Sequence, residues 1–142
     1  MFKGSIIIVE DDDALREQLN NHFSSEGYCV QAESCSHEAL SSLEASKFDV
    51  MIADLTTAGV DGRDLLYHMR SQYPMTRLIM VSGFIDLDQL LKCAQNQIET
   101  IIFKPLEDLS EITQAVEKAV EHHNLWRRKF NEYENNFKNG ST

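Results

Sequence analysis

The stretch IIIVEDDD, residues 6–13, decides the fold, because four β-branched apolar residues are followed at once by four carboxylates. A continuous apolar run of this length is typical of a strand that a parallel sheet buries on both faces. Four further short apolar runs occupy residues 28–32, 50–53, 78–81 and 101–103. In the second run, Tyr28, Val30 and Ala32 alternate with Cys29, Gln31 and Glu33, which predicts a half-exposed edge strand.

Amphipathic stretches with helical spacing separate these runs. Leu15, Leu19 and Phe23 recur every four residues, and Leu65 and Met69 repeat the same spacing further along the chain. Strands that alternate with helices require right-handed crossovers between parallel strands. The sequence therefore predicts an α/β protein of (βα)5 pattern, a doubly wound parallel five-stranded sheet with the flavodoxin-like order 2-1-3-4-5.

The composition excludes several classes of protein. A length of 142 residues suits one domain, and no run approaches the roughly 20 apolar residues of a membrane span. The first residues do not resemble a signal peptide, so a cytoplasmic protein without a membrane partner is expected. A net charge of −10 argues against nucleic-acid binding through a basic surface. The three cysteines form no CxxC pair, and this indicates neither a disulfide framework nor a zinc site.

Polar side chains stand at the carboxyl ends of four predicted strands: Glu10 and Asp11, then Asp54, Ser82 and Lys104. Because parallel strands end at the same edge of a sheet, these groups are expected to lie together. Gathered carboxylates need a cation, and Mg²⁺ is the one that prefers oxygen ligands with a phosphate. A carboxylate can also attack phosphorus and form an aspartyl-phosphate. The pattern predicts a phosphoacceptor site with Mg²⁺ as its cofactor.

Each of these residues also has an ordinary structural interpretation. Asp12 and Asp13 precede a helix, where carboxylates cap the first turn and favour the helix dipole. Asp54 alone would be a turn residue, and Lys104 before a proline would be a surface loop. Only the combination of all these residues at one edge of the sheet is specific.

Four segments carry a family resemblance: IIIVEDD at 6–12, MIADLTTAGVDG at 51–62, IMVSG at 79–83 and FKP at 103–105. Together they resemble the receiver domain of response regulators in two-component signalling. The resemblance implies that Asp54 accepts a phosphoryl group from a sensor histidine kinase or a phosphotransfer protein. It also implies that Asp11 ligates Mg²⁺ directly, Glu10 largely through water and Thr56 through its backbone carbonyl. By the same resemblance, Ser82 and Lys104 contact the phosphoryl group, and the Lys104–Pro105 bond is cis.

The chain also departs from the family pattern. Ala58 stands where receivers commonly have proline, and Ile101 stands where they have an aromatic residue that reports the switch. Phe103 lies two residues further on and should point to the same side of the strand. The alternative is therefore a pseudo-receiver, which acts only as an interaction or dimerisation module. An aspartyl phosphatase is less favoured, since Thr56 stands where such enzymes place a second Asp. We expect a self-phosphorylating and autodephosphorylating switch, not a multiple-turnover enzyme.

The segment after the predicted receiver domain, 1–120, has its own pattern. A seam with alternating spacings of four and three residues is formed by Ile112, Val116, Ala119, His123, Trp126, Phe130, Tyr133 and Phe137. The seam predicts that the fifth helix continues to about residue 135, as a helical extension within 121–142. Three interpretations are open: homodimerisation through this helix, which we favour, aromatics folded back on the domain, or continuation into an output module. His123 in the seam should weaken pairing at acid pH.

Overall fold

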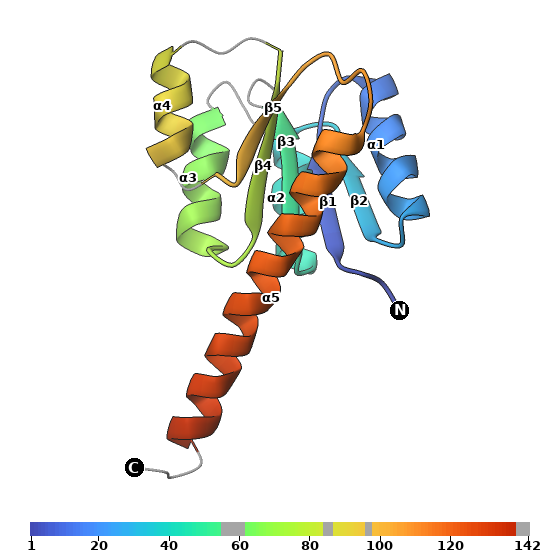
Figure 1. The fold of residues 1–142 in the computed structure, drawn as a ribbon. Helices are drawn as coiled ribbons and strands as arrows, with labels where there is room; N and C mark the ends of the chain where they lie inside the picture. Colours follow the sequence, from blue (N-terminus) through green and yellow to red (C-terminus); the bar gives the residue numbers. More distant parts are fainter. Residues whose placement is uncertain (55–61, 84–86, 96–97, 139–142) are drawn as a thin grey trace.

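The computed structural model describes residues 1–54, 62–83, 87–95 and 98–138, and Figure 1 shows their arrangement. Thr56 and Ala58 lie outside these described residues. The strands are β1 (Ser5–Val9), β2 (Cys29–Glu33), β3 (Val50–Asp54), β4 (Arg77–Ser82) and β5 (Thr100–Phe103). The helices are α1 (Asp13–Ser25), α2 (Ser36–Ala45), α3 (Gly62–Gln72), α4 (Leu87–Gln95) and α5 (Ser110–Lys138).

The five strands form one parallel sheet with the order β2-β1-β3-β4-β5, which confirms the predicted fold and strand order. Strand β2 lies at the edge of this sheet. Its Cys29 and Gln31 are exposed while Val30 and Ala32 are half-buried, as the alternation predicts. Strands β1 and β3 are central and almost fully buried, which explains their unbroken apolar sequence.

Two hydrophobic cores cover the two faces of the sheet. Ile6 and Ile8 of β1 pack in the first core with side chains from α1 and α5. Ile7 and Val9 pack in the second core with side chains from α2 and α3. Successive residues of one strand thus contact opposite helical layers, which Figure 1 shows in front of the sheet and behind it.

The first helix begins where the sequence predicts. The Asp12 carboxylate caps α1 by accepting a hydrogen bond from the Leu15 amide at 3.1 Å. Asp13 lies in the first turn and pairs with Arg16 at 2.6 Å, with its side chain 89% exposed. Both carboxylates therefore have the ordinary structural role. After the helix, Gly27 adopts a φ of 101°, a conformation that glycine permits, and the chain turns into β2.

Helix α5 is far longer than the sheet that it covers. Its first half buries Ile112, Val116 and Ala119 against the sheet. Its second half extends beyond the domain and ends at Lys138, slightly later than predicted (Figure 1). The helix runs without a break through residue 120, where the sequence predicts the end of the receiver domain. None of the helices in the described segments is long and apolar enough to span a membrane.

Candidate functional site

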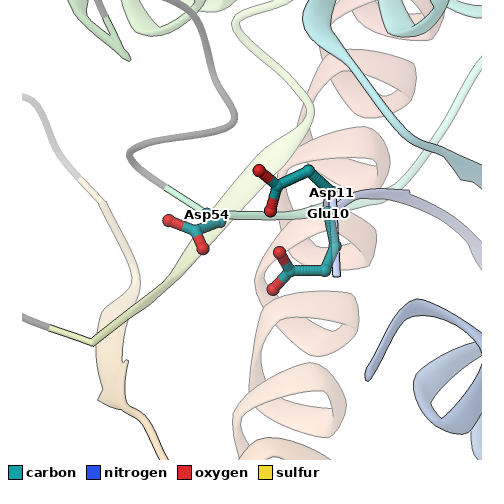
Figure 2. A group of neighbouring side chains, drawn as sticks. All are labelled: Glu10, Asp11 and Asp54. Atoms are coloured by element: carbon teal, nitrogen blue, oxygen red, sulfur yellow. The ribbon is translucent and has the colours of Figure 1, made fainter. Parts of the chain in front are cut away.

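Three carboxylates meet at the carboxyl edge of the sheet. Glu10 and Asp11 follow β1, and Asp54 ends β3, whose Ala53 is in register with Val9 of β1. One oxygen atom from each carboxylate lies within 4.8 Å of the others. Figure 2 shows the three side chains at this edge. Glu10 and Asp54 are only 2% and 5% exposed, whereas Asp11 is exposed. Three carboxylate oxygens at this spacing fit a hard divalent cation such as Mg²⁺.

Lys104 follows β5 and brings a positive charge to the same place. Its Nζ lies 2.6 Å from Asp54 Oδ2 and 2.7 Å from Glu10 Oε1. The backbone positions this side chain, because the Lys104 amide donates to the Ser82 carbonyl at 2.9 Å. The Lys104–Pro105 peptide bond is cis, as the resemblance implies.

Ser82 ends β4 beside these groups and is 1% exposed. The structure therefore brings together five of the predicted site residues, which are Glu10, Asp11, Asp54, Ser82 and Lys104. Thr56, the sixth, lies outside the described residues. The shared location follows from the parallel sheet alone, since each residue ends a different strand.

The electrostatics of the site keep the Lys104 side chain positively charged among the carboxylates. Burial raises the pKa of Glu10, and the hydrogen bond and positive charge of Lys104 oppose that rise. Burial by itself would lower the pKa of Lys104, but its hydrogen bonds to Asp54 and Glu10 outweigh burial and raise that pKa. Lys104 therefore stays protonated and offsets part of the negative charge.

The sequence did not indicate one residue that supports the site. Arg16 of α1 donates from Nη1 to the backbone carbonyl of Glu10 at 2.9 Å, while its Nη2 bonds Asp13. Arg16 thereby fixes the backbone that presents Glu10 and Asp11. Its position six residues after Glu10, one turn into a helix that begins with acidic residues, is the signal that could have revealed it.

Ile101, at the position where receivers commonly have an aromatic residue, and Phe103, two residues later, differ in exposure. Ile101 of β5 is half-buried and packs against the second core, whereas Phe103 is 53% exposed. An aromatic ring is thus available at the surface, two residues after the position where receivers commonly have one.

The fold and the site define a class of protein: a flavodoxin-like domain with an acidic, lysine-containing site at the carboxyl edge of its sheet. The model of the family described as response regulator receiver domain matches residues 6–117. The chain therefore belongs to the response regulator receiver domain family, and receiver domains of this family serve phosphoacceptor signalling in two-component systems.

Curated relatives include the DNA-binding transcriptional regulator NtrC of Proteus hauseri, 28% identical over 123 residues. That match covers 87% of this chain and 26% of the relative. The Regulator of RpoS from Escherichia coli (strain K12) is 29% identical over 111 residues, which cover 78% of this chain and 33% of the relative. The chain thus spans a quarter to a third of the length of these relatives.

Solved structures show the same fold. The signal receiver domain of a putative Luxo repressor protein from Vibrio parahaemolyticus has a TM-score of 0.79 at 20% identity, over 87% of this chain and 95% of that one. The response regulator protein TrrA from Thermotoga maritima, in complex with Mg²⁺ and BeF, has a TM-score of 0.71 at 20% identity, over 82% and 98%.

Proposed function

We propose that this chain is a signalling switch that accepts a phosphoryl group on Asp54 in a Mg²⁺-dependent reaction. The contact between the Lys104 ammonium and the buried Asp54 carboxylate, beside Glu10 and Asp11, carries the proposal. A surface turn aspartate would need neither a buried cation nor two neighbouring carboxylates.

The reaction joins a carboxylate oxygen of Asp54 to phosphorus, while the bond between phosphorus and the donor breaks and the donor keeps the electron pair. Glu10, Asp11 and Asp54 would hold Mg²⁺, with the Thr56 carbonyl as the ligand that the family resemblance adds. When bound, Mg²⁺ would neutralise charge on the phosphoryl oxygens. The Lys104 ammonium and the Ser82 hydroxyl then remain to contact those oxygens, and the buried site limits access of water.

The donor is a phosphohistidine on a sensor histidine kinase or on a phosphotransfer protein, and the reaction takes place in the cytoplasm. The chain turns over its own adduct by autodephosphorylation and does not process a separate substrate. Its net charge of −10 supports the view that this chain itself does not bind nucleic acid, although relatives such as NtrC are DNA-binding regulators.

Incubation with acetyl phosphate and Mg²⁺, followed by intact mass, tests this proposal. We expect one phosphoryl group on the wild-type chain, none on Asp54→Asn, and an unchanged adduct on Glu17→Gln, which removes an equal charge from an exposed position of α1. A label that persists in Asp54→Asn would disprove the assignment of the phosphoacceptor. A wild-type chain without any adduct would favour the pseudo-receiver, for which Ile101 is the supporting observation.

A further inference from the structure

The C-terminal half of α5 carries an exposed aromatic stripe. We define the stripe as Trp126, Phe130, Tyr133 and Phe137, which are 52%, 55%, 61% and 67% exposed. The rings of Trp126 and Phe130 lie 6.5 Å apart, and those of Tyr133 and Phe137 lie 4.5 Å apart. Four exposed aromatic residues along one side of a helix are characteristic of an interaction surface.

The stripe continues the side of α5 that faces its own sheet. His123 and Ala119 lie three and seven residues before Trp126 on the same seam, where Ala119 is buried and His123 contacts the base of the domain. There His123 Nε2 lies 3.0 Å from Asp49 Oδ1, and its Nδ1 lies 3.0 Å from the Met75 carbonyl. The domain therefore lies on the stripe side of α5, directly beyond the end of the stripe (Figure 1).

This placement excludes parallel pairing of two stripes. In a parallel pair both domains would lie between the two helices at the same height, and they would overlap. In an antiparallel pair each domain lies beyond the C-terminal end of the other helix. Among the described elements, Figure 1 shows no helix or strand beside the C-terminal half of α5. An antiparallel arrangement is thus the one in which both stripes can be covered.

The order of the aromatic residues fits antiparallel self-pairing. The spacings along the stripe are four, three and four residues, so the stripe is symmetric about the point between residues 131 and 132. Trp126 of one copy therefore lies opposite Phe137 of the other, and Phe130 opposite Tyr133. On one flank, Arg127 comes within about two residues, or ~3 Å along the axis, of the Glu134 level of the second copy. Both charges are exposed, and the symmetry makes this pair twice.

A groove stands where the end of the second helix would arrive. It has a volume of about 560 Å³ and is lined by Met75 and Ile98 of the domain base together with Trp126 and Phe130 of the stripe. Since Phe137 of the second copy lies level with Trp126, its ring would enter this groove. The stripe and the groove would then form one continuous and mostly apolar surface, with Arg77, Glu99 and His122 as the charged and titratable side chains of the groove.

We propose that the occupant of the stripe and groove is a second copy of this chain, bound antiparallel with its Phe137 in the groove. The contact extends over about three helical turns, which places it among the small, weak interfaces. The inference goes beyond the proposed phosphoacceptor function and does not depend on it.

Sedimentation equilibrium of the 142-residue chain at roughly 100 μM, a concentration suited to weak interfaces, tests the surface. We expect a dimer for the wild type and a monomer for Phe130→Glu, whose charge would enter the seam. Asn135→Glu adds the same charge on the opposite side of the helix and should leave the dimer intact. In urea unfolding at a concentration low enough to keep the wild type monomeric, both variants should keep the wild-type midpoint, because both positions are exposed. A monomeric wild type, or a dimeric Phe130→Glu, would overturn the proposal.

Disulfide trapping tests the orientation. Trp126→Cys and Phe137→Cys are made separately in a chain with Cys29→Ser and Cys35→Ser, while Cys93 stays buried. We expect a disulfide dimer only when the two proteins are mixed, because the mixed dimer keeps one Trp126–Phe137 contact at its other end. Disulfide dimers of each protein alone would show parallel pairing, and no disulfide in the mixture would rule out the register. Asp54 labelling should be unchanged by Phe130→Glu, so failure of either proposal leaves the other standing.

Discussion

At the scale of single residues, Lys104 holds the site together. Its ammonium contacts two buried carboxylates from two different strands, Glu10 and Asp54. The sequence predicts that these three residues share an edge of the sheet, because each ends a parallel strand. It does not predict which carboxylates Lys104 contacts, because that depends on side-chain conformations. The hydrogen bond from Arg16 to the Glu10 carbonyl could not be predicted from the sequence for the same reason.

Removal of the Lys104 charge should destabilise the chain in the absence of Mg²⁺. Lys104→Met leaves Glu10 and Asp54 buried without their shared cation, which should lower the free energy of unfolding by about 1–3 kcal/mol. Urea unfolding in EDTA measures this change. Lys118→Met, on the exposed side of α5, removes an equal charge and is the matched control. If both variants lose the same stability, the Lys104 contacts contribute nothing specific.

At the scale of elements, α5 shows what a periodic pattern can and cannot predict. The seam predicts a helix to about residue 135, and the helix ends at Lys138. The same seam predicts His123 as a residue that faces a partner helix and weakens pairing at acid pH. The structure corrects this, because His123 contacts Asp49 and Met75 within its own chain. The helical spacing of the seam cannot predict contacts of His123 with residues as distant in sequence as Asp49 and Met75.

His123 should make the docking of α5 depend on pH. The hydrogen bond to Asp49 raises the pKa of His123 despite its burial, with a further rise from the Met75 carbonyl and an opposing effect of Arg127. A raised folded-state pKa means that the stabilisation is complete below about pH 6.5 and is lost as pH rises through the folded-state value. Burial alone would raise the pKa of Asp49, but its hydrogen bonds from His123 and the Ser5 amide lower it. Its contribution is therefore present above about pH 3.9 and lost as pH falls.

The measurement is urea unfolding between pH 5.5 and 9. From low to high pH, the free energy of unfolding of the wild type should fall by about 1 kcal/mol more than that of His123→Gln. The variant has no ionisable group at this position. His37→Gln replaces an exposed histidine of α2 and should follow the wild type. Equal pH slopes for the wild type and His123→Gln would show that the contacts to Asp49 and Met75 do not depend on charge.

Helix α4 is the element that we expect to report phosphorylation. Leu87, Leu90 and Leu91 are 70%, 39% and 52% exposed, so this helix buries little apolar surface for its length. Weakly packed elements open most readily, and loops at phosphoryl sites commonly drive such changes. Position 101 is a half-buried isoleucine, so no aromatic side chain at this position can change its rotamer to signal phosphorylation. Beryllofluoride with Mg²⁺ should therefore change amide exchange in residues 82–96, while β1 stays protected. Unchanged exchange in α4 would contradict this expectation.

At the scale of the whole molecule, the topology accounts for the site and its acidity. The five parallel strands all end at one edge of the sheet. Residues separated by almost a hundred positions in the sequence, such as Glu10 and Lys104, therefore meet there. The alternation of apolar runs and amphipathic stretches was enough to predict this arrangement. It was not enough to predict the groove at the base of the domain, which the α3–β4 connection, the start of β4, residues 98–99 before β5, and α5 form together.

Because the carboxylate cluster forms only in the folded chain, Mg²⁺ should stabilise the whole domain. A ligand that binds only the native state adds about 2.7 kcal/mol to the free energy of unfolding at a hundred times its Kd. We expect this gain for the wild type in urea unfolding with increasing MgCl2 at constant ionic strength. Asp11→Asn should lose most of the gain, since it removes one of the three clustered carboxylates. Glu17→Gln removes an equal charge from an exposed position of α1, outside the cluster, and should keep the gain. An equal response of both variants would mean that Mg²⁺ acts only by screening the net charge of −10.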